Sequence, residues 1–136
     1  MIEVHTDAAC SGDPGMSAAG IVIKTNNQTE EHQFFLGTWT NHEAEFLAVS
    51  RALELCRSDY PGEIISIRSD SKIVVDTLDR KYTKNKKFLP LFEHIQELEQ
   101  SFSFVFYKWI PDKQNRHADK LARECLLKHA QNPDQS

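Results

Sequence analysis

Hydrophobic and polar residues alternate along the first part of the chain, a pattern that is typical of β-strands. Ile2, Val4 and Thr6 lie on one side of the first such segment. Two more segments with strand character follow at 18–25 and 32–38, separated by the turn-forming sequence TNNQTE. Three strands joined by short connections predict an antiparallel meander.

The apolar spacing then changes from two residues to three or four, which predicts a helix. The positions on its apolar face are Ala44, Leu47, Ala48, Ala52 and Leu55. Thr40 and Glu43 match the capping box that starts a helix, in which each residue bonds the backbone of the other. We therefore expect the helix to begin directly after Thr40.

Strands and helices alternate over the rest of the chain. We predict a strand at 63–69, a short helix carrying Ile73, Val74 and Leu78, a helix at 89–98 and a strand at 102–110. A last helix is expected to start near Asn115, with inward positions Ala118, Leu121, Ala122, Cys125 and Leu126. The order βββαβα(α)βα predicts one mixed sheet with helices on its faces, an α/β or α+β architecture. We expect one domain over 1–128 and a frayed tail at 129–136.

The composition narrows the class of protein. The 136 residues fit one domain, and 40% hydrophobic with 26% charged residues is ordinary for a soluble globular protein. No apolar run is long enough to span a bilayer, and the N-terminus lacks the regions of a signal peptide. The three cysteines lie far apart with no CxxC motif, which argues against a disulfide framework or a zinc site. We expect a cytoplasmic protein without membrane contact, monomeric and with no obligate protein partner.

The charge is unevenly distributed along the chain. Its formal net value is −4, so the protein as a whole is not a basic nucleic-acid binder. Residues 80–87, RKYTKNKK, nevertheless hold five of the sixteen Lys and Arg residues. This segment is either a solvated loop or a local patch that touches DNA phosphates.

Four acidic residues occupy positions where a merely solvating charge is unusual. Asp7 lies at the end of the first predicted strand, and Asp70 lies where the fourth strand meets the helix after it. Glu45 and Asp119 each follow an inward-facing alanine, which places them at the edge of the apolar face of their helices. These are positions from which a side chain overlooks a cleft.

Each of these acids also has a structural explanation. Asp70 could cap the helix that follows it, and Asp119 could pair with Arg123 one helical turn later. Asp7 is hardest to explain in this way, because an apolar strand has little use for a lone charge. If the four acids converge, a cation must neutralise them, and a set of oxygen ligands alone favours Mg²⁺ or Mn²⁺. Such clusters commonly hold two metal ions for in-line displacement at phosphorus.

Four sequence segments resemble the type I ribonuclease H family in their order and spacing: TDAACSGDPG, TNHEAEFLA, RSDSKIVV and KWIPDKQNRHADKLA. The resemblance extends from Ile2 to about Leu127. It implies the ribonuclease H fold, a five-stranded mixed sheet with strands 1 to 3 antiparallel, flanked by helices.

The resemblance also implies an activity and a set of site residues. The implied activity is endonucleolytic cutting of the RNA strand of an RNA–DNA hybrid, with two Mg²⁺ or Mn²⁺ ions and with 3′-hydroxyl and 5′-phosphate ends. The family's catalytic and metal-binding acids correspond to Asp7, Glu45, Asp70 and Asp119. By analogy, Asp7 bridges the two ions, Asp119 helps to hold the ion that activates water, and Glu45 and Asp70 lie at the leaving-group ion.

Further residues match positions that contact the substrate in the family. Gly12 and Gly15 would bring the backbone of their turn close to the RNA. Thr40 and Asn41 correspond to positions that contact the DNA phosphate and the minor groove. Asn115 is either a helix cap or a partner that orients one of the acids.

This chain departs from the family pattern in three ways. Asp13, in the substrate-binding turn, stands where the family usually has Asn, and a negative charge there is expected to weaken or alter the binding of a polyanion. The link PDKQN at 111–115 has no histidine, and the basic protrusion of longer members is missing. Both features are those of a compact member of the family.

Two other functions remain open. The departures favour a hybrid- or RNA-binding module with little turnover, although the intact set of four acids argues against it. A nuclease of the wider superfamily, acting on a junction or a single strand, is the other alternative.

Overall fold

One mixed β-sheet forms the centre of this computed structural model, in which residues 1–131 are described. The elements are, in chain order, β1 (Ile2–Cys10), β2 (Gly15–Lys24), β3 (Thr29–Trp39), α1 (Asn41–Asp59), β4 (Ile64–Ser69), α2 (Lys72–Arg80), α3 (Leu89–Glu99), β5 (Phe104–Trp109), the 3₁₀ turn η1 (Asp112–Gln114) and α4 (Arg116–Gln131). The strand order is β3-β2-β1-β4-β5. Strands β1, β2 and β3 pair antiparallel, whereas β4 pairs parallel with β1 and with β5. The expected five-stranded mixed sheet and its element order are confirmed.

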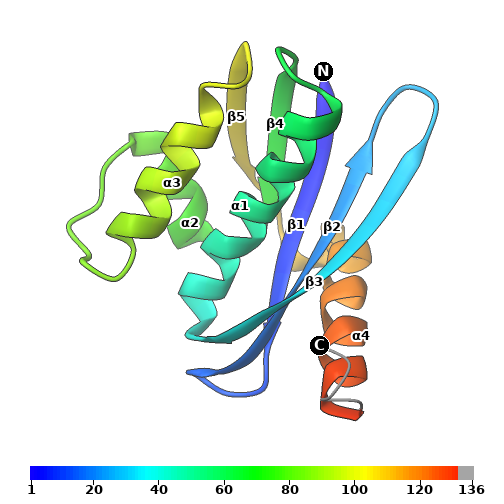
Figure 1. Ribbon diagram of the computed structural model, residues 1–136, viewed down its shortest axis with the longest axis vertical. Coiled ribbons are helices and arrows are strands. Elements are labelled where there is room, and N and C mark those ends of the chain that lie inside the picture. The colour runs from blue at the N-terminus through cyan, green and yellow to red at the C-terminus, as the bar shows by residue number, and fades with distance from the viewer. Residues whose placement is uncertain (132–136) are drawn as a thin grey trace.

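The helices cover the two faces of the sheet unequally. Helices α1, α2 and α3 lie together on one side, and α4 lies alone on the other (Figure 1). Helix α4 packs against β1, β2 and β3, and α1 packs against β1 and α3. Among residues 1–131, no helix is long and apolar enough to cross a bilayer.

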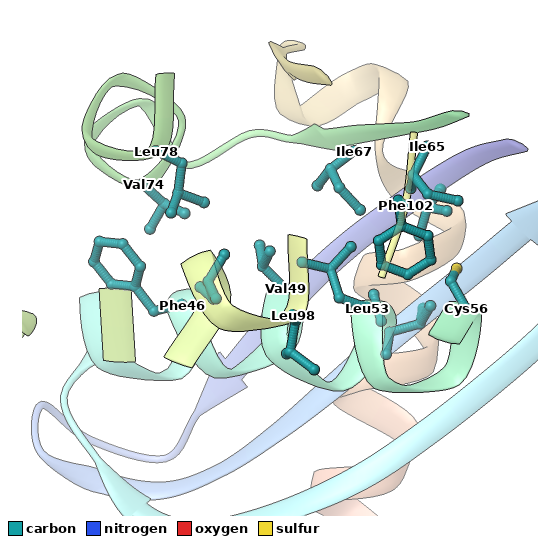
Figure 2. Packing of buried hydrophobic residues seen from close by; sticks show 14 of the residues in the cluster. Phe46, Val49, Leu53, Cys56, Ile65, Ile67, Val74, Leu78, Leu98 and Phe102 are labelled. Carbon is teal, nitrogen blue, oxygen red and sulfur yellow. The ribbon is translucent and has the colours of Figure 1, made fainter. Parts of the chain in front are cut away.

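The main hydrophobic core fills the space between the sheet and the layer of α1, α2 and α3. Figure 2 shows Val49 and Leu53 of α1 facing Ile65 and Ile67 of β4, whereas Phe46 lies toward Val74 and Leu78 of α2. Because α1 is packed between the sheet and α3, it buries more than one stripe of residues.

The expected apolar face of α1 is therefore only partly right. Its alanines, Ala44, Ala48 and Ala52, are fully buried. Leu47 and Leu55 are only half-buried, and Phe46, Val49 and Leu53 take the central positions of the core. In α4, the expected Ala118, Leu121 and Ala122 are buried, whereas Cys125 and Leu126 are half-buried.

Two expected boundaries differ from the structure. Strand β1 does not end at Asp7 but continues to Cys10, because residues 8–10 pair with residues 17–19 of β2. Helix α4 extends to Gln131, beyond the expected end of the domain at residue 128. The expected tail thus begins inside this helix, and its residues 132–136 lie outside the described part of the chain.

Candidate active site

Three of the four predicted acids meet at one point of the sheet. Asp7 of β1, Glu45 of α1 and Asp70, directly after β4, each contribute one carboxylate oxygen to a group whose members lie within 4.8 Å of one another. Asp7 is buried, with 6% of its surface exposed. The convergence agrees with the prediction from the sequence.

The pairing of two parallel strands brings Asp7 and Asp70 together. The ladder between β1 and β4 ends with the pair Thr6 and Ser69, and each acid is the residue that follows. Asp70 does not cap the next helix, because the N-cap of α2 is Ser71 and no side-chain cap bond is formed there. The simpler explanation of Asp70 as a helix cap is thereby removed.

The start of α1 fixes the position of Glu45. The predicted capping box is present: the backbone N–H of Glu43 donates to Thr40 Oγ1 at 3.3 Å, and the backbone N–H of Thr40 donates to Glu43 Oε1 at 3.0 Å. Glu43 is used in this cap and is not part of the acidic group. Glu45 lies two residues further along, where the second turn of the helix begins, and its carboxylate lies beside that of Asp7.

Burial and mutual repulsion disfavour ionisation of these three acids. Burial, and then the charge of Asp70, raises the pKa of Asp7 to about 8. Burial, and then the charges of Asp7 and Asp70, raises the pKa of Glu45 well above its usual range. Burial likewise raises the pKa of Asp70. Glu45 Oε1 is buried without a hydrogen-bond donor. Converging carboxylate oxygens that repel one another, one of them without a protein partner, fit a divalent cation.

Asp119 lines the same cleft but stands slightly apart from the other three. Its Oδ2 atom lies 2.7 Å from Nη2 of Arg123, so the predicted pair one helical turn apart is formed. Its charge still acts on Asp7 and Asp70 and raises the pKa of both. Asp119 thus serves both interpretations offered by the sequence: it forms an ion pair and it borders the acidic group.

Gly20 positions α4, and the sequence analysis did not identify it. It lies opposite Asp7 in the ladder between β1 and β2. A Cβ atom at Gly20 would lie 2.1 Å from the carbonyl oxygen of Ala118 and 2.6 Å from the backbone nitrogen of Ala122. Only glycine lets the helix that carries Asp119 approach so closely. A glycine inside an otherwise apolar strand is the signal that would have indicated this contact.

Asn115 is buried beneath the acidic group, with 1% of its surface exposed. Its side-chain amide donates to the carbonyl oxygen of Thr6 at 2.8 Å and to Asp70 Oδ2 at 3.4 Å. The backbone carbonyl of Asn115 accepts the backbone N–H of Asp119 at 3.1 Å, at the start of α4. The side-chain Oδ1 of Asn115 is buried and has no hydrogen-bond partner within residues 1–131, so Asn115 makes no side-chain cap bond. The structure therefore supports its role as a partner of Asp70 and not as a side-chain cap.

The other predicted substrate contacts gather around the start of α1. Asp13 Oδ1 accepts the backbone N–H of Asn41 at 2.8 Å, which ties the glycine turn to the helix. Gly15 packs on its neighbour in the turn, since a Cβ there would lie 2.5 Å from the backbone nitrogen of Gly12. Thr40 forms the capping box described above.

A polar cleft of about 360 Å³ joins these groups. It is lined by Asp7, Ala8, Cys10, Asn41, His42, Glu45, Asp70, Ser71 and Asp119. All four predicted acids and the predicted Asn41 border it, whereas Cys10, His42 and Ser71 were not among the candidates. The cleft thus combines an acidic floor with a rim that includes the polar residues Asn41, His42 and Ser71.

Comparisons with known proteins agree with this geometry. A family model described as "Reverse transcriptase-like" matches residues 5–125. A protein of Enterococcus faecalis named "Putative hydrolase EbsB" is 39% identical, with 94% of this chain and 96% of the relative covered. A ribonuclease H of Maricaulis maris is 30% identical, with 92% and 93% covered.

Solved structures with the same fold point in the same direction. The RNase H1 of Halobacterium salinarum superposes with a TM-score of 0.86 at 28% identity, covering 93% of this chain and 98% of that one. LC11-RNase H1, solved in complex with an RNA/DNA hybrid, superposes with a TM-score of 0.89 at 26% identity, covering 96% and 99%. The similarity therefore extends over nearly the whole of each chain.

Proposed function

We propose that this chain, which belongs to the ribonuclease H family, is a metal-dependent endonuclease. It hydrolyses the RNA strand of RNA–DNA hybrids. The products would carry 3′-hydroxyl and 5′-phosphate ends. One observation carries the proposal: Asp7, Glu45 and Asp70 converge within 4.8 Å in a cleft that Asp119 also lines. A cluster of mutually repelling acids costs stability, and binding alone does not require it.

The donor set supports Mg²⁺ or Mn²⁺ as the cofactor. All the candidate ligands are carboxylate oxygens, and hard cations prefer these. When bound, such ions lower the pKa of the attacking water and stabilise the departing 3′-oxygen. The chain's own contribution is to hold the acids at fixed positions, which strand pairing and the cap of α1 provide.

We assign the four acids different roles. The charge of Asp7 acts on Glu45, and the charges of Asp70 and Asp119 act on Asp7, which supports Asp7 as the shared ligand. Asp119 would serve the side where water attacks, and Glu45 and Asp70 the leaving-group side. The amide of Asn115 would orient Asp70 through its bond to Oδ2.

The central experiment is cleavage of a labelled RNA–DNA hybrid with Mg²⁺ and Mn²⁺ in parallel, beside duplex DNA and duplex RNA. We expect Asp7→Asn and Asp70→Asn each to reduce the rate by more than about 100-fold, since loss of a partner behind a ligand already costs about 10- to 100-fold. Asp79→Asn, which changes an exposed acid on α2, is the matched control and should cut normally. Robust cleavage by either site variant would exclude the mechanism.

A binding module without turnover is the second candidate function. Asp13, whose charge lies in the glycine turn, and the link 111–115 without histidine favour it. Measuring affinity and turnover on one hybrid separates the two functions, because tight binding without products would support the module. We also propose that the protein is a cytoplasmic monomer; its three cysteines are free, as expected in a reducing compartment.

A further inference from the structure

A second cleft, of about 450 Å³, adjoins the acidic one. Its lining residues are Asp70, Asp112, Lys113, Arg116, Asp119, Lys120 and Arg123. Asp70 and Asp119 line both clefts, so the two share a wall. Four of the chain's sixteen Lys and Arg residues thus gather beside the acidic site, in a protein of net charge −4.

The four cations of this second cleft are not equally available. Nη2 of Arg123 lies 2.7 Å from Oδ2 of Asp119, and Nζ of Lys120 lies 3.9 Å from Oε1 of Glu124. Lys113 and Arg116 are exposed and have no ion-pair partner within residues 1–131. These two side chains are therefore the ones free to bind an anion.

The backbone holds Lys113 and Arg116 in place. Lys113 lies in η1, where the N–H of Gln114 donates to Pro111 and the N–H of Asn115 donates to Asp112. Arg116 is the first residue of α4, next to the buried Asn115 that is anchored to β1. A cationic pair on a fixed turn loses little backbone entropy when it binds a ligand.

We propose that Lys113 and Arg116 bind a backbone phosphate of the RNA strand next to the bond that is cut. The inference rests on the proposed function, which places the cut bond over the shared wall of Asp70 and Asp119. A guanidinium and an ammonium together match the geometry and charge of a phosphate. The cut strand is the ligand, since a polymer lying across this wall must enter both clefts.

Asp112 also lines the second cleft and opposes anion binding there. The other two acids, Asp70 and Asp119, are those assigned to the metal ions, so their charge is neutralised in the loaded enzyme. Lys113 and Arg116, the two cations without an ion-pair partner within residues 1–131, then face Asp112 alone. Two free cations against one acid leave this lining with a net positive charge, which attracts phosphate.

Equilibrium binding tests this proposal without relying on turnover. The Asp7→Asn chain keeps the RNA intact and serves as the reference chain. The double variant adds Lys113→Ala and Arg116→Ala to it. The affinity of each chain for a labelled hybrid is measured by fluorescence anisotropy at several salt concentrations. We expect the slope of log K against log salt to fall by about 1 to 2, and the affinity at low salt to fall about tenfold. Both residues are exposed, so the fold should be unaffected, which circular dichroism checks.

The matched control removes two cations from the opposite end of the sheet. Lys24 pairs with Glu3, four positions along β1 from Asp7, and Arg57 lies in the last turn of α1, twelve residues after Glu45. Lys24→Ala/Arg57→Ala changes the net charge equally and should leave the slope within about 0.3 of its starting value. An equal loss in both double variants would show a general charge effect and overturn the proposal.

The position of the phosphate is found by placing one uncharged methylphosphonate linkage at each site of either strand. We expect one linkage in the RNA strand, within about two nucleotides of the cut, to weaken binding by the reference chain but not by the double variant. Coupling only to the DNA strand, or to no linkage, would overturn the proposal. Cleavage by the unsubstituted chain is measured separately. If that chain binds the hybrid without cutting it, the proposed function is refuted, whereas the binding comparison between the reference chain and the double variant still tests the phosphate site.

Discussion

At the scale of single residues, the three converging acids make stability depend on pH. The folded chain raises the pKa of Asp7 from its ordinary value near 3.8 to about 8, mainly through burial. A carboxyl group with a raised pKa stabilises the fold fully below its unfolded pKa and loses that contribution as pH rises through the folded pKa. We therefore expect the melting temperature of the metal-free protein to fall between about pH 4 and pH 8, as measured by circular dichroism with chelator. Added Mg²⁺ should restore it.

Removing one of these acids should stabilise the same metal-free protein. In Asp70→Asn, the amide oxygen can still accept from Asn115 while the repulsion with Asp7 is lost. We expect the melting temperature at pH 8 to rise by roughly 5 °C and the gain from Mg²⁺ to shrink. Asp79→Asn, on the exposed face of α2, is the control and should leave the pH profile unchanged. A profile that is flat in the unsubstituted protein would contradict the assignment of a buried, repelling cluster.

Asp13 offers a separate test of charge at one residue. Its Oδ1 accepts the N–H of Asn41, and an asparagine side chain can make the same bond. Asp13→Asn should therefore keep the melting temperature and strengthen hybrid binding about threefold, since a negative charge facing a polyanion is removed. Asp13→Ala removes the acceptor as well and should lower stability by about 0.5–1 kcal/mol. Unchanged affinity in both variants would show that the turn does not face the substrate.

At the scale of elements, the contact between β2 and α4 decides where Asp119 lies. In Gly20→Ala, the added methyl group would meet the backbone of Ala118, which cannot move without shifting the helix. We expect a loss of at least about 2 kcal/mol in unfolding free energy and a fall in cleavage rate of about 100-fold, because misplacement by 1 Å can cost that much.

Another glycine separates this packing effect from backbone strain. Gly62 has φ of +77° but nothing within 4 Å of an added Cβ. Gly62→Ala should cost about 1–2 kcal/mol and leave the rate of the remaining folded protein unchanged. If Gly20→Ala behaved in the same way, the approach of α4 would not control the site.

The elements also show which parts of the site the sequence could predict. Local apolar patterns place Asp7 near the end of one strand and Asp70 at the end of another. Their convergence depends on the parallel pairing of β1 with β4, which joins residues about sixty positions apart and which those patterns do not specify. The position of Gly20 depends on a helix about a hundred residues later in the chain, and no local pattern contains that information. The burial of Phe46 likewise depends on α3, which covers the side of α1 that a single apolar stripe leaves exposed.

At the scale of the whole molecule, an acidic chain has to bind a polyanion, and its cations are arranged to allow this. One group surrounds the second cleft beside the acids. Another lies in the segment 80–87, which runs from the end of α2 toward α3 and is mostly exposed. Lys84 of this segment borders a further cleft of about 330 Å³ together with Tyr82 and Phe88. The two groups belong to different parts of the fold, so they can hold different parts of one substrate.

This arrangement predicts that the two groups act on different strands and add independently. Lys84→Ala/Lys86→Ala should lower the salt slope of hybrid binding by about 1 to 2, with the control Lys24→Ala/Arg57→Ala unchanged. A methylphosphonate linkage in the DNA strand should weaken binding less when Lys84 and Lys86 are substituted. For Lys113 and Arg116 of the second cleft, the linkage with this effect should lie in the RNA strand. Sites that share no residue and no phosphate give additive free energies, so combining the two pairs of substitutions should sum their effects on the slope. A slope that the substitutions at 84 and 86 leave unchanged would show that the segment is only a solvated loop, and that the acidic chain binds its substrate through the clefts beside the sheet alone.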